Sequence, residues 1–339
     1  MIGFSFATLF SGGGGADLGF MAAGGWPAWA VEYDAEIAQV YQENIGDHVI
    51  VSDVGLVDYS ALPAVDLLHA SPVCTRASVA NTAGKESDLD TGAAAAVARA
   101  LADLRPRWFT LENVYQYREF SAFRLILAAL DDLGYIWDFS SVNSADYGIP
   151  QTRRRLILRA SRGLLRDMPG RTGPVGWFSA VADLVDDLPD SKLAPWQSAR
   201  LPADLSGPVA FGNHPHTVSG ARSFVPHGEH GFAVSSQYLG RARAVLIDGN
   251  NTSGPGRSGG MVFVDQDQPS FTIAGARSAI HRGIISGRVV GMTPRALARF
   301  QSFPDSYVLP EKRTLAAKVI GNAAPPLLMR RVAESVIDL

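Results

Sequence analysis

The stretch SFATLFSGGGGADLGFMAA, residues 5–23, carries the local signals that decide the fold. Residues 5–10 form an apolar, β-prone run typical of a strand, and residues 16–23 suit a helix. The glycines at positions 12–15 let the backbone approach a ligand closely at the start of that helix. Many dinucleotide-binding folds share this strand–glycine–helix pattern, so alone it indicates an α/β fold and no particular ligand.

The first 160 residues continue this alternation of short strands and helices. Such alternation is typical of a doubly wound α/β fold, in which a mostly parallel sheet carries helices on both faces. Ligands of these folds bind beside the loops that follow the carboxyl ends of the strands. Further strands are predicted at residues 29–32, 49–52, 66–70, 108–111, 135–142 and 156–160, and further helices at residues 35–44, 92–104 and 122–133.

The pattern changes from about residue 163 onward. Glycine, proline, serine and histidine become frequent there, and only short β-like pieces such as residues 244–247 and 261–264 interrupt the irregular stretch. Regular structure resumes at residues 294–300, and residues 325–336 predict a final amphipathic helix. We therefore expect one large α/β domain and a smaller, loop-rich domain.

Charge is distributed unevenly along the chain, although the net charge is only −3. Residues 1–150 contain 7 Lys and Arg against 19 Asp and Glu, whereas residues 151–339 contain 23 against 14. This asymmetry predicts that the second half faces a polyanion, and the alternative is that the two halves neutralise each other across an interface. Of the 30 basic residues 26 are Arg, which suits contacts with phosphates and base edges but could also reflect genomic base composition.

Cysteine content and hydropathy exclude several classes of protein. The chain contains a single Cys, which excludes an intrachain disulfide and a multi-thiolate metal site. No apolar run reaches the roughly 20 residues that a membrane helix needs. The N-terminus lacks the basic and apolar regions of a secretion signal. We expect a cytoplasmic protein that does not bind a membrane.

Acidic residues end the second and third predicted strands. Glu32, followed by Tyr33, ends the second strand, and Asp53 ends the third. A carboxylate after the second strand commonly accepts hydrogen bonds from ribose hydroxyls, and Asp53 could accept one from an adenine amino group. Either acid alone would more often be a helix cap or a surface residue. In this order, after a glycine loop, they predict a nucleoside cofactor.

Candidate catalytic residues follow the next strands. The segment Ser71-Pro72-Val73-Cys74 comes directly after the fourth strand. A lone Cys is most often an inert core residue, but this position is one where catalytic residues gather. Glu112 ends the next strand, and residues 151–155, QTRRR, lead into another. Alternation along that strand would project Arg153 and Arg155 to one face and Arg154 to the other.

These segments resemble the DNA (cytosine-5)-methyltransferases, and the resemblance spans nearly the whole chain. No single block is specific, but their joint occurrence in this order is. Only the stretch from residue 161 to about 280, the usual place of the target recognition domain, is not covered. The matching blocks are FSGGGG (10–15), Glu32-Tyr33, Asp53, Pro72 to Cys74, Glu112-Asn113-Val114, NSADYGIPQ (143–151), the set Gln151, Arg153 and Arg155, RFQSFP (299–304) and IGNAAPP (320–326).

The resemblance implies a class I methyltransferase fold, which is Rossmann-like, and a division into three segments. Residues 1–165 would form the cofactor-binding and catalytic domain, residues 166–280 the target recognition domain, and residues 281–339 a return to the catalytic domain. The expected substrate is a specific sequence in double-stranded DNA. A monomer is expected, and a separately acting restriction endonuclease is a candidate partner.

The resemblance also implies a mechanism. Cys74 would add as a thiolate to C6 of a flipped-out cytosine, its thiolate favoured by a positive local field. Glu112 would be protonated, or share a proton, at cytosine N3. Arg155, with Arg153 beside it, would hold O2 and balance the negative charge that develops there. C5 then attacks the sulfonium methyl, and a base removes the C5 proton to release Cys74.

S-adenosyl-L-methionine is the implied cofactor, with S-adenosyl-L-homocysteine as product. Phe10 would stack on adenine, Gly12 and nearby amides would hold the methionine end, and Glu32 would bind the ribose. Asp53 and Val54 would face the adenine, and two residues near the C-terminus would complete the same pocket. The full set of implied cofactor residues is Phe10, Ser11, Gly12, Gly13, Gly14, Glu32, Tyr33, Asp53, Val54, Pro72, Asn322 and Ala324.

The chain departs from the family pattern beside the nucleophile. The family usually has Pro before this Cys and often Gln after it, whereas Val73 and Thr75 stand here. Pro fixes the backbone, so we expect Val73 to leave Cys74 more mobile and to retune the rate rather than abolish it. Pro72 and Ser78 still fit, and residues 90–102 match the next block only weakly. An inactive regulatory homologue is the alternative.

The loop-rich stretch contains four His residues, at positions 214, 216, 227 and 230. No Cys and no acidic pair with metal-ligand spacing accompanies them, so we expect polar loop residues and no metal site. Arg241, Arg243 and Arg257 are candidate contacts with DNA phosphates or bases, and the sequence does not sort one kind of contact from the other.

Three other functions compete with this interpretation. The tRNA-modifying branch of the family carries a Cys-Phe-Thr signature in the inserted domain, and the unrelated RNA fold uses two catalytic cysteines, so a single Cys at position 74 argues against both. A nicotinamide-dependent oxidoreductase fits the glycine loop and Glu32. It leaves Cys74, Glu112 and Arg155 unexplained. A non-catalytic DNA-binding module is the third alternative, and a methylation assay separates it.

Overall fold

The structure is a computed structural model that describes residues 3–72, 86–193, 195–199, 201, 244–247, 263–275, 281–285 and 287–337. The chain divides into two compact units. The division at 165/166 and 280/281 stays a prediction; the compact units change at 171/172 and 322/323, and a short segment before the last strand of unit 1 belongs to unit 2. Unit 1 consists of Met1–Tyr147, Arg154–Arg171 and Ala323–Leu339, and unit 2 of Gly148–Arg153 and Thr172–Asn322.

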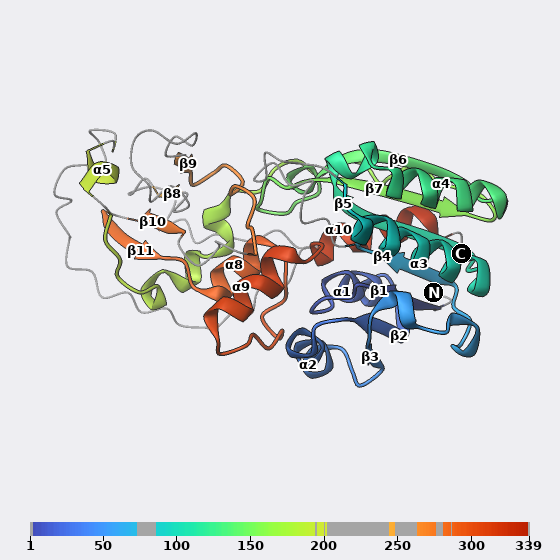
Figure 1. The fold of residues 1–339 in the computed structure, drawn as a ribbon. Coiled ribbons are helices and arrows are strands. Elements are labelled where there is room, and N and C mark those ends of the chain that lie inside the picture. Colours follow the sequence, from blue (N-terminus) through green and yellow to red (C-terminus); the bar gives the residue numbers. More distant parts are fainter. Residues whose placement is uncertain are drawn as a thin grey trace. The chain divides into compact units, whose positions relative to one another are not determined.

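Unit 1 is built on a seven-stranded sheet with the strand order β3-β2-β1-β4-β5-β7-β6 (Figure 1). The pairs from β3 to β5 are parallel, and β7 pairs antiparallel with both β5 and β6. The predicted doubly wound, mostly parallel sheet is therefore confirmed. The strands are β1 (Phe4–Leu9), β2 (Gly25–Glu32), β3 (Val49–Val51), β4 (Leu67–Ala70), β5 (Trp108–Val114), β6 (Ile136–Asn143) and β7 (Arg154–Ser161).

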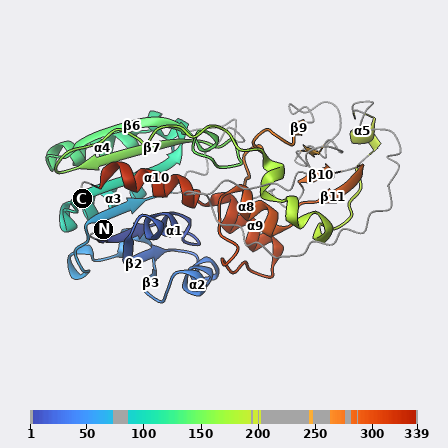
Figure 2. The same cartoon turned by 180° about the vertical axis from the view of Figure 1, so that it is seen from behind.

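Helices cover both faces of this sheet, because alternate residues of its central strands are apolar on both sides. Ala7 and Leu9 of β1 belong to the core that α3 and α4 cover, whereas Phe6 packs against Phe20 of α1 with ring centroids 5.3 Å apart. Figure 2 shows α1 and α10 on the face opposite to α3 and α4. The helices are α1 (Gly15–Ala22), α2 (Ala35–Asn44), α3 (Asp88–Leu104), α4 (Ser121–Asp132) and α10 (Pro326–Val336), with 3-10 turns η1 (Val54–Leu56), η2 (Tyr59–Ala61), η3 (Tyr115–Glu119) and η4 (Ser144–Asp146).

The first and last helices of unit 1 approach each other closely at Gly19. A Cβ atom on Gly19 of α1 would lie 2.4 Å from the backbone oxygen of Pro326 and 2.7 Å from Cβ of Met329 in α10. Only glycine permits this approach. The two ends of the chain are thus joined in one unit by direct backbone contact.

Unit 2 contains a small antiparallel sheet with the order β11-β10-β8-β9 and several short helices. Arg299 of the predicted RFQSFP block is buried there, where it pairs with Asp183 and with Asp305. Much of the predicted loop-rich stretch lies outside the described residues. The elements are η5 (Trp177–Ala180), η6 (Ala182–Asp187), α5 (Pro195–Ser198), β8 (Val245–Ile247), β9 (Phe263–Asp265), β10 (Arg282–Ile285), β11 (Arg288–Gly291), α8 (Pro294–Phe300) and α9 (Arg313–Asn322).

Within the described ranges, no helix combines the length and the apolar character needed to cross a membrane.

A buried carboxylate lies directly behind the glycine loop of unit 1. Oδ1 of Asp17, in the first turn of α1, accepts hydrogen bonds from the Thr8 hydroxyl at 3.0 Å and the Tyr41 hydroxyl at 2.7 Å. The Tyr41 oxygen also lies 2.9 Å from Nε2 of His48. Burial raises the pKa of Asp17 to about 6. The network joins β1, α1 and α2 through a carboxyl group that titrates near neutral pH.

Replacing Asp17 with Asn should make stability less dependent on pH between about 4 and 6. The folded-state pKa is about 6 and the unfolded value is near 3.8. The proton held by folded Asp17 therefore stabilises the fold fully below about pH 4, and this contribution is lost as pH rises through 6. Its full size is roughly 3 kcal/mol, since each pKa unit is worth about 1.4 kcal/mol. Asn keeps the Oδ1 acceptor and does not titrate.

Urea unfolding of both proteins at several pH values measures this effect. The unfolding free energy of wild type minus that of Asp17→Asn should fall as pH rises from about 4 to 7. Asp132→Asn, at an exposed position on α4, is the control variant. A difference between wild type and Asp17→Asn that stays constant over this pH range would contradict the assignment.

Candidate active site

The glycine loop between β1 and α1 leaves open space beside its backbone. Phe10 and Gly12 both adopt positive φ angles, 59° and 56°. A Cβ atom on Gly12 would have no other atom within 4 Å among the described residues. A ligand could therefore approach the loop at this residue as closely as the backbone itself allows.

Glu32 holds this loop from the carboxyl end of β2. Its Oε2 accepts the Gly12 N–H at 2.8 Å, and its Oε1 accepts the Asp34 N–H at 2.9 Å. A carboxylate has about four acceptor sites, so Glu32 can still accept from a ligand. Tyr33 beside it is 76% exposed. The acid predicted to bind a ribose thus also fixes the shape of the glycine loop.

Asp53 and Val54 lie after β3, at the turn η1. Oδ1 of Asp53 accepts the Gly55 N–H at 2.7 Å, so this exposed acid caps the turn. Val54 is buried, and its carbonyl oxygen accepts the Tyr59 hydroxyl at 2.8 Å and Nη2 of Arg99 at 3.3 Å. The turn after β3 is therefore held in place from two sides. Both predicted residues lie at the same edge of the sheet as the glycine loop.

The chain leaves β4 toward the predicted nucleophile through Ser71 and Pro72. Nδ2 of the buried Asn113 donates to the Pro72 carbonyl oxygen at 3.0 Å, and Oδ1 of Asn113 accepts the Val114 N–H at 2.8 Å. The end of β5 thereby fixes the last described residue before Cys74. Cys74 itself, with Val73 and Thr75, lies outside the described residues, as do the candidate DNA contacts Arg241, Arg243 and Arg257 and the four His of the loop-rich stretch.

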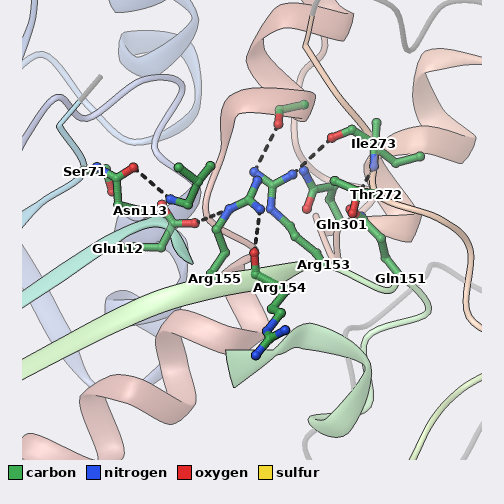
Figure 3. Close-up of polar contacts among 12 residues, drawn as sticks. Ser71, Glu112, Asn113, Gln151, Arg153, Arg154, Arg155, Thr272, Ile273 and Gln301 are labelled. Carbon is green, nitrogen blue, oxygen red and sulfur yellow. Dashed lines mark hydrogen bonds and ion pairs between the residues drawn. The ribbon is translucent and has the colours of Figure 1, made fainter. Parts of the chain in front are cut away.

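Glu112 and Arg155 form an ion pair in the interior of unit 1 (Figure 3). Nε of Arg155 lies 2.9 Å from Oε1 of Glu112, and the two side chains are only 13% and 6% exposed. The pair follows from the strand register, because β5 and β7 pair with Val114 opposite Arg155. Burial lowers the pKa of Arg155, against the effect of the Glu112 charge, but a guanidinium remains charged.

Arg153 does not share this partner, contrary to the expectation that it would stand beside Arg155 on one face of a strand. It precedes β7 and belongs to unit 2, where it is 2% exposed. Its terminal nitrogens donate to the carbonyl oxygens of Ile273 and Gly321, each at 3.1 Å (Figure 3). The alternation of side chains along a strand does not apply to Arg153, because β7 begins only at Arg154. Arg153 therefore links two backbone segments of unit 2.

Gln151 also links two backbone segments of unit 2. Its Oε1 accepts the Ile273 N–H at 3.0 Å, and its Nε2 donates to the Phe300 carbonyl oxygen at 3.3 Å. Of the two predicted C-terminal cofactor residues, Asn322 is the exposed last residue of α9 in unit 2, and Ala324 is buried in unit 1. Within the QTRRR block, Gln151 and Arg153 therefore hold backbone segments in place, whereas Arg155 belongs to the buried ion pair.

Sequence reasoning missed Glu86, the first described residue after Cys74. Its carboxylate accepts the backbone N–H groups of Ser121 at 2.9 Å and Ala122 at 2.6 Å, and the Ser121 hydroxyl at 2.7 Å. It thus caps the N-terminus of α4 from another part of the chain, and these contacts lower its pKa despite the cost of desolvation. No local sequence signal reveals a cap that comes from 35 residues away.

Among the residues that the structure covers, no group of three or more His, Cys, Asp and Glu side chains could hold a metal ion.

Comparisons with known proteins identify the relatives of this chain. A family model described as C-5 cytosine-specific DNA methylase matches residues 4–175 and 260–338. The chain is 26% identical to Type II methyltransferase M1.HphI of Haemophilus parahaemolyticus, covering 99% of this chain and 87% of the relative. It is 26% identical to Type II methyltransferase M.NlaX of Neisseria lactamica, covering 98% and 96%.

A solved structure shares the fold. The Entamoeba histolytica methyltransferase EhMeth has a TM-score of 0.65 and 13% sequence identity, covering 99% of this chain and 98% of that one. The stretch that the family model leaves unmatched lies within the predicted target recognition segment, residues 166–280. Because the family model matches most of the chain, on both sides of that stretch, the chain belongs to the C-5 cytosine-specific DNA methylases and is a DNA (cytosine-5)-methyltransferase.

Proposed function

We propose that the protein transfers a methyl group from S-adenosyl-L-methionine to C5 of a flipped-out cytosine in a specific double-stranded DNA sequence, through a covalent bond between Cys74 and C6. The observation that carries this proposal is the buried Glu112–Arg155 pair at the end of β5. Strand β4, which leads to Cys74, is the direct neighbour of β5. A carboxylate and a guanidinium near the end of β4 match the acceptor and donor groups on one edge of cytosine.

The residues around the glycine loop fit S-adenosyl-L-methionine, which supplies an electrophilic methyl group when bound. Gly12 faces open space, and Glu32 keeps acceptor capacity for ribose hydroxyls. Oγ of Ser11 is buried and has no hydrogen-bond partner among the described residues. A buried hydroxyl without a partner is costly, and a polar ligand in the loop would satisfy it. Phe10, Asp53 and Val54 would contact the adenine.

In the proposed mechanism, Cys74 attacks C6 of cytosine because C5 alone is a poor nucleophile. The new S–C6 bond pushes an electron pair toward O2 and N3. Glu112 shares a proton with N3, and Arg155, held by Glu112, balances the charge that develops on O2. S-adenosyl-L-methionine, when bound, would supply the methyl group to C5 and would leave as S-adenosyl-L-homocysteine. The C5 proton would then be lost to a base, and the S–C6 bond would break to restore the thiolate.

Arg153 takes a different role in this proposal than the resemblance implied. Its guanidinium already holds two backbone carbonyls in a nearly inaccessible position. We assign it to positioning the Ile273 and Gly321 segments rather than to the cytosine. Arg155 remains the residue that balances the charge on O2.

Double-stranded DNA is the proposed substrate, and a cytosine within a duplex must leave the stack to reach Cys74. The positive balance of residues 151–339 suits phosphate contacts, so affinity should fall with salt. A monomer would suffice for this reaction, and a restriction endonuclease of the same specificity would act separately. None of the described contacts favours an RNA substrate over DNA.

Replacing Cys74 with Ser should abolish methyl transfer, because a serine hydroxyl is far less ionised than a thiol at neutral pH. Cofactor and DNA binding should persist. DNA with 5-fluorocytosine at the target position provides the sharpest measurement, since fluorine blocks the final elimination. Wild type plus cofactor should form a denaturation-resistant adduct, and Cys74→Ser should form none. A persistent adduct from the variant would exclude Cys74 as nucleophile.

Replacing Glu32 with Gln should weaken S-adenosyl-L-methionine binding. The amide nitrogen of Gln cannot accept the Gly12 or Asp34 N–H, so one anchor of the loop is lost along with a ribose acceptor. Each lost hydrogen bond costs about 0.5–1.5 kcal/mol. Calorimetric titration with the cofactor measures the change, with the exposed Glu36→Gln as control. Unchanged affinity in Glu32→Gln would remove Glu32 from the cofactor site.

A further inference from the structure

We propose that His69 is a positioning residue that sets the place of the nucleophile relative to Glu112, by fixing the Ser71 hydroxyl where the chain leaves β4. This inference rests on the proposed role of Cys74. It assigns a function to a buried imidazole that the reaction itself does not use.

His69 connects β4, after which the chain continues to Cys74, with β5, which carries Glu112. It stands opposite Thr110 in the pairing of β4 with β5. Nδ1 of the imidazole lies 2.9 Å from the Thr110 hydroxyl oxygen, and Nε2 lies 2.9 Å from the Ser71 hydroxyl oxygen. Phe20 packs edge-on against the ring, with centroids 5.3 Å apart. Both ring nitrogens therefore have a described hydrogen-bond partner, and Phe20 packs against the ring.

The imidazole acts as a fixed neutral link. His69 is 1% exposed, and burial lowers its pKa to about 3, so it carries no charge at neutral pH. A neutral imidazole holds one proton and one lone pair, so it donates to one hydroxyl and accepts from the other. Either tautomer fixes Ser71. An uncharged His in this position is suited to holding geometry rather than to moving protons at neutral pH.

The hydrogen-bonded link runs from Thr110 through His69 to Ser71. Each of its ends is close in sequence to a proposed catalytic residue. Thr110 and Glu112 are two residues apart on β5, so their side chains share one face of the strand. Ser71 is three residues before Cys74, and the chain spans at most about 3.6 Å per residue, so their Cα atoms lie within about 11 Å. Asn113 fixes the neighbouring Pro72 carbonyl. His69 and Asn113 thus tie Ser71 and Pro72, which precede Cys74 in the sequence, to β5, the strand that carries Glu112.

Two variants of His69 separate this role from simple core packing. The amide of Gln reaches about as far as Nε2 of His, so His69→Gln keeps a partner for Ser71. The amide of Asn reaches about as far as Nδ1, so His69→Asn keeps the Thr110 partner only. Both replacements are neutral, polar and smaller than imidazole. Ser71→Ala removes the same link from its other end, and Ser335→Ala, a buried hydroxyl in α10, is the control.

The readout is the rate of covalent adduct formation on 5-fluorocytosine DNA with saturating cofactor, together with cofactor affinity and melting temperature. His69→Asn and Ser71→Ala should slow adduct formation roughly ten- to hundredfold, as expected for a misplaced nucleophile. Cofactor affinity should change by less than about twofold, because only the rate of the chemical step depends on the link. His69→Gln should recover most of the rate. The double variant His69→Asn/Ser71→Ala should be no slower than the slower single variant.

Equal rates for His69→Asn, His69→Gln and wild type would overturn the positioning role. If His69→Asn does not fold, Ser71→Ala decides alone, and a wild-type rate in that variant would equally overturn it. Failure of the proposed function looks different, because wild type itself would then form no adduct. A loss in Ser335→Ala as large as in Ser71→Ala would also contradict the inference, since any buried hydroxyl would then matter.

Discussion

The buried ion pair between Glu112 and Arg155 is the interaction on which the site depends. Two charges removed from water are costly unless each is paired, so neither residue can be placed there without the other. The pairing requires β7 to run antiparallel beside β5, with Val114 opposite Arg155. The one strand that runs opposite to the other six strands of the sheet is thus also the strand that supplies the cation. The order of the strands and the candidate catalytic residues are therefore linked through one contact, the ion pair between Glu112 and Arg155.

Other polar side chains serve mainly to hold backbone. Glu32 fixes the glycine loop, Asn113 fixes Pro72, and Glu86 caps α4. In unit 2, Gln151 and Arg153 are bound to backbone groups of segments far along the chain. Buried polar groups that bond to backbone remove unsatisfied donors and acceptors and leave few alternative arrangements. Many of the residues in the family's motifs therefore hold loop backbone in place. Only a few of these residues are available to contact a substrate.

The sequence predicted the fold class and most elements of unit 1, because its strands and helices carry strong local periodicity. Through the resemblance it also gave Glu112 and Arg155 as candidate catalytic residues, but it did not predict the ion pair between them. It could not predict that Arg153 would belong elsewhere, since this depends on where β7 begins. Helix α9 and strands β10 and β11 were not predicted, because their short apolar runs resemble the surrounding loops. The link from His69 to Thr110 depends on the register between β4 and β5, which local patterns do not carry.

We propose that this enzyme methylates C5 of cytosine at a defined DNA sequence. Bisulfite sequencing of DNA from cells that express the protein tests it most directly, because bisulfite leaves 5-methylcytosine unconverted. We expect unconverted cytosines at one recurrent sequence, at the same position in each copy, and none in cells without the protein. Complete conversion in expressing cells, or unconverted cytosines without a shared sequence, would contradict it.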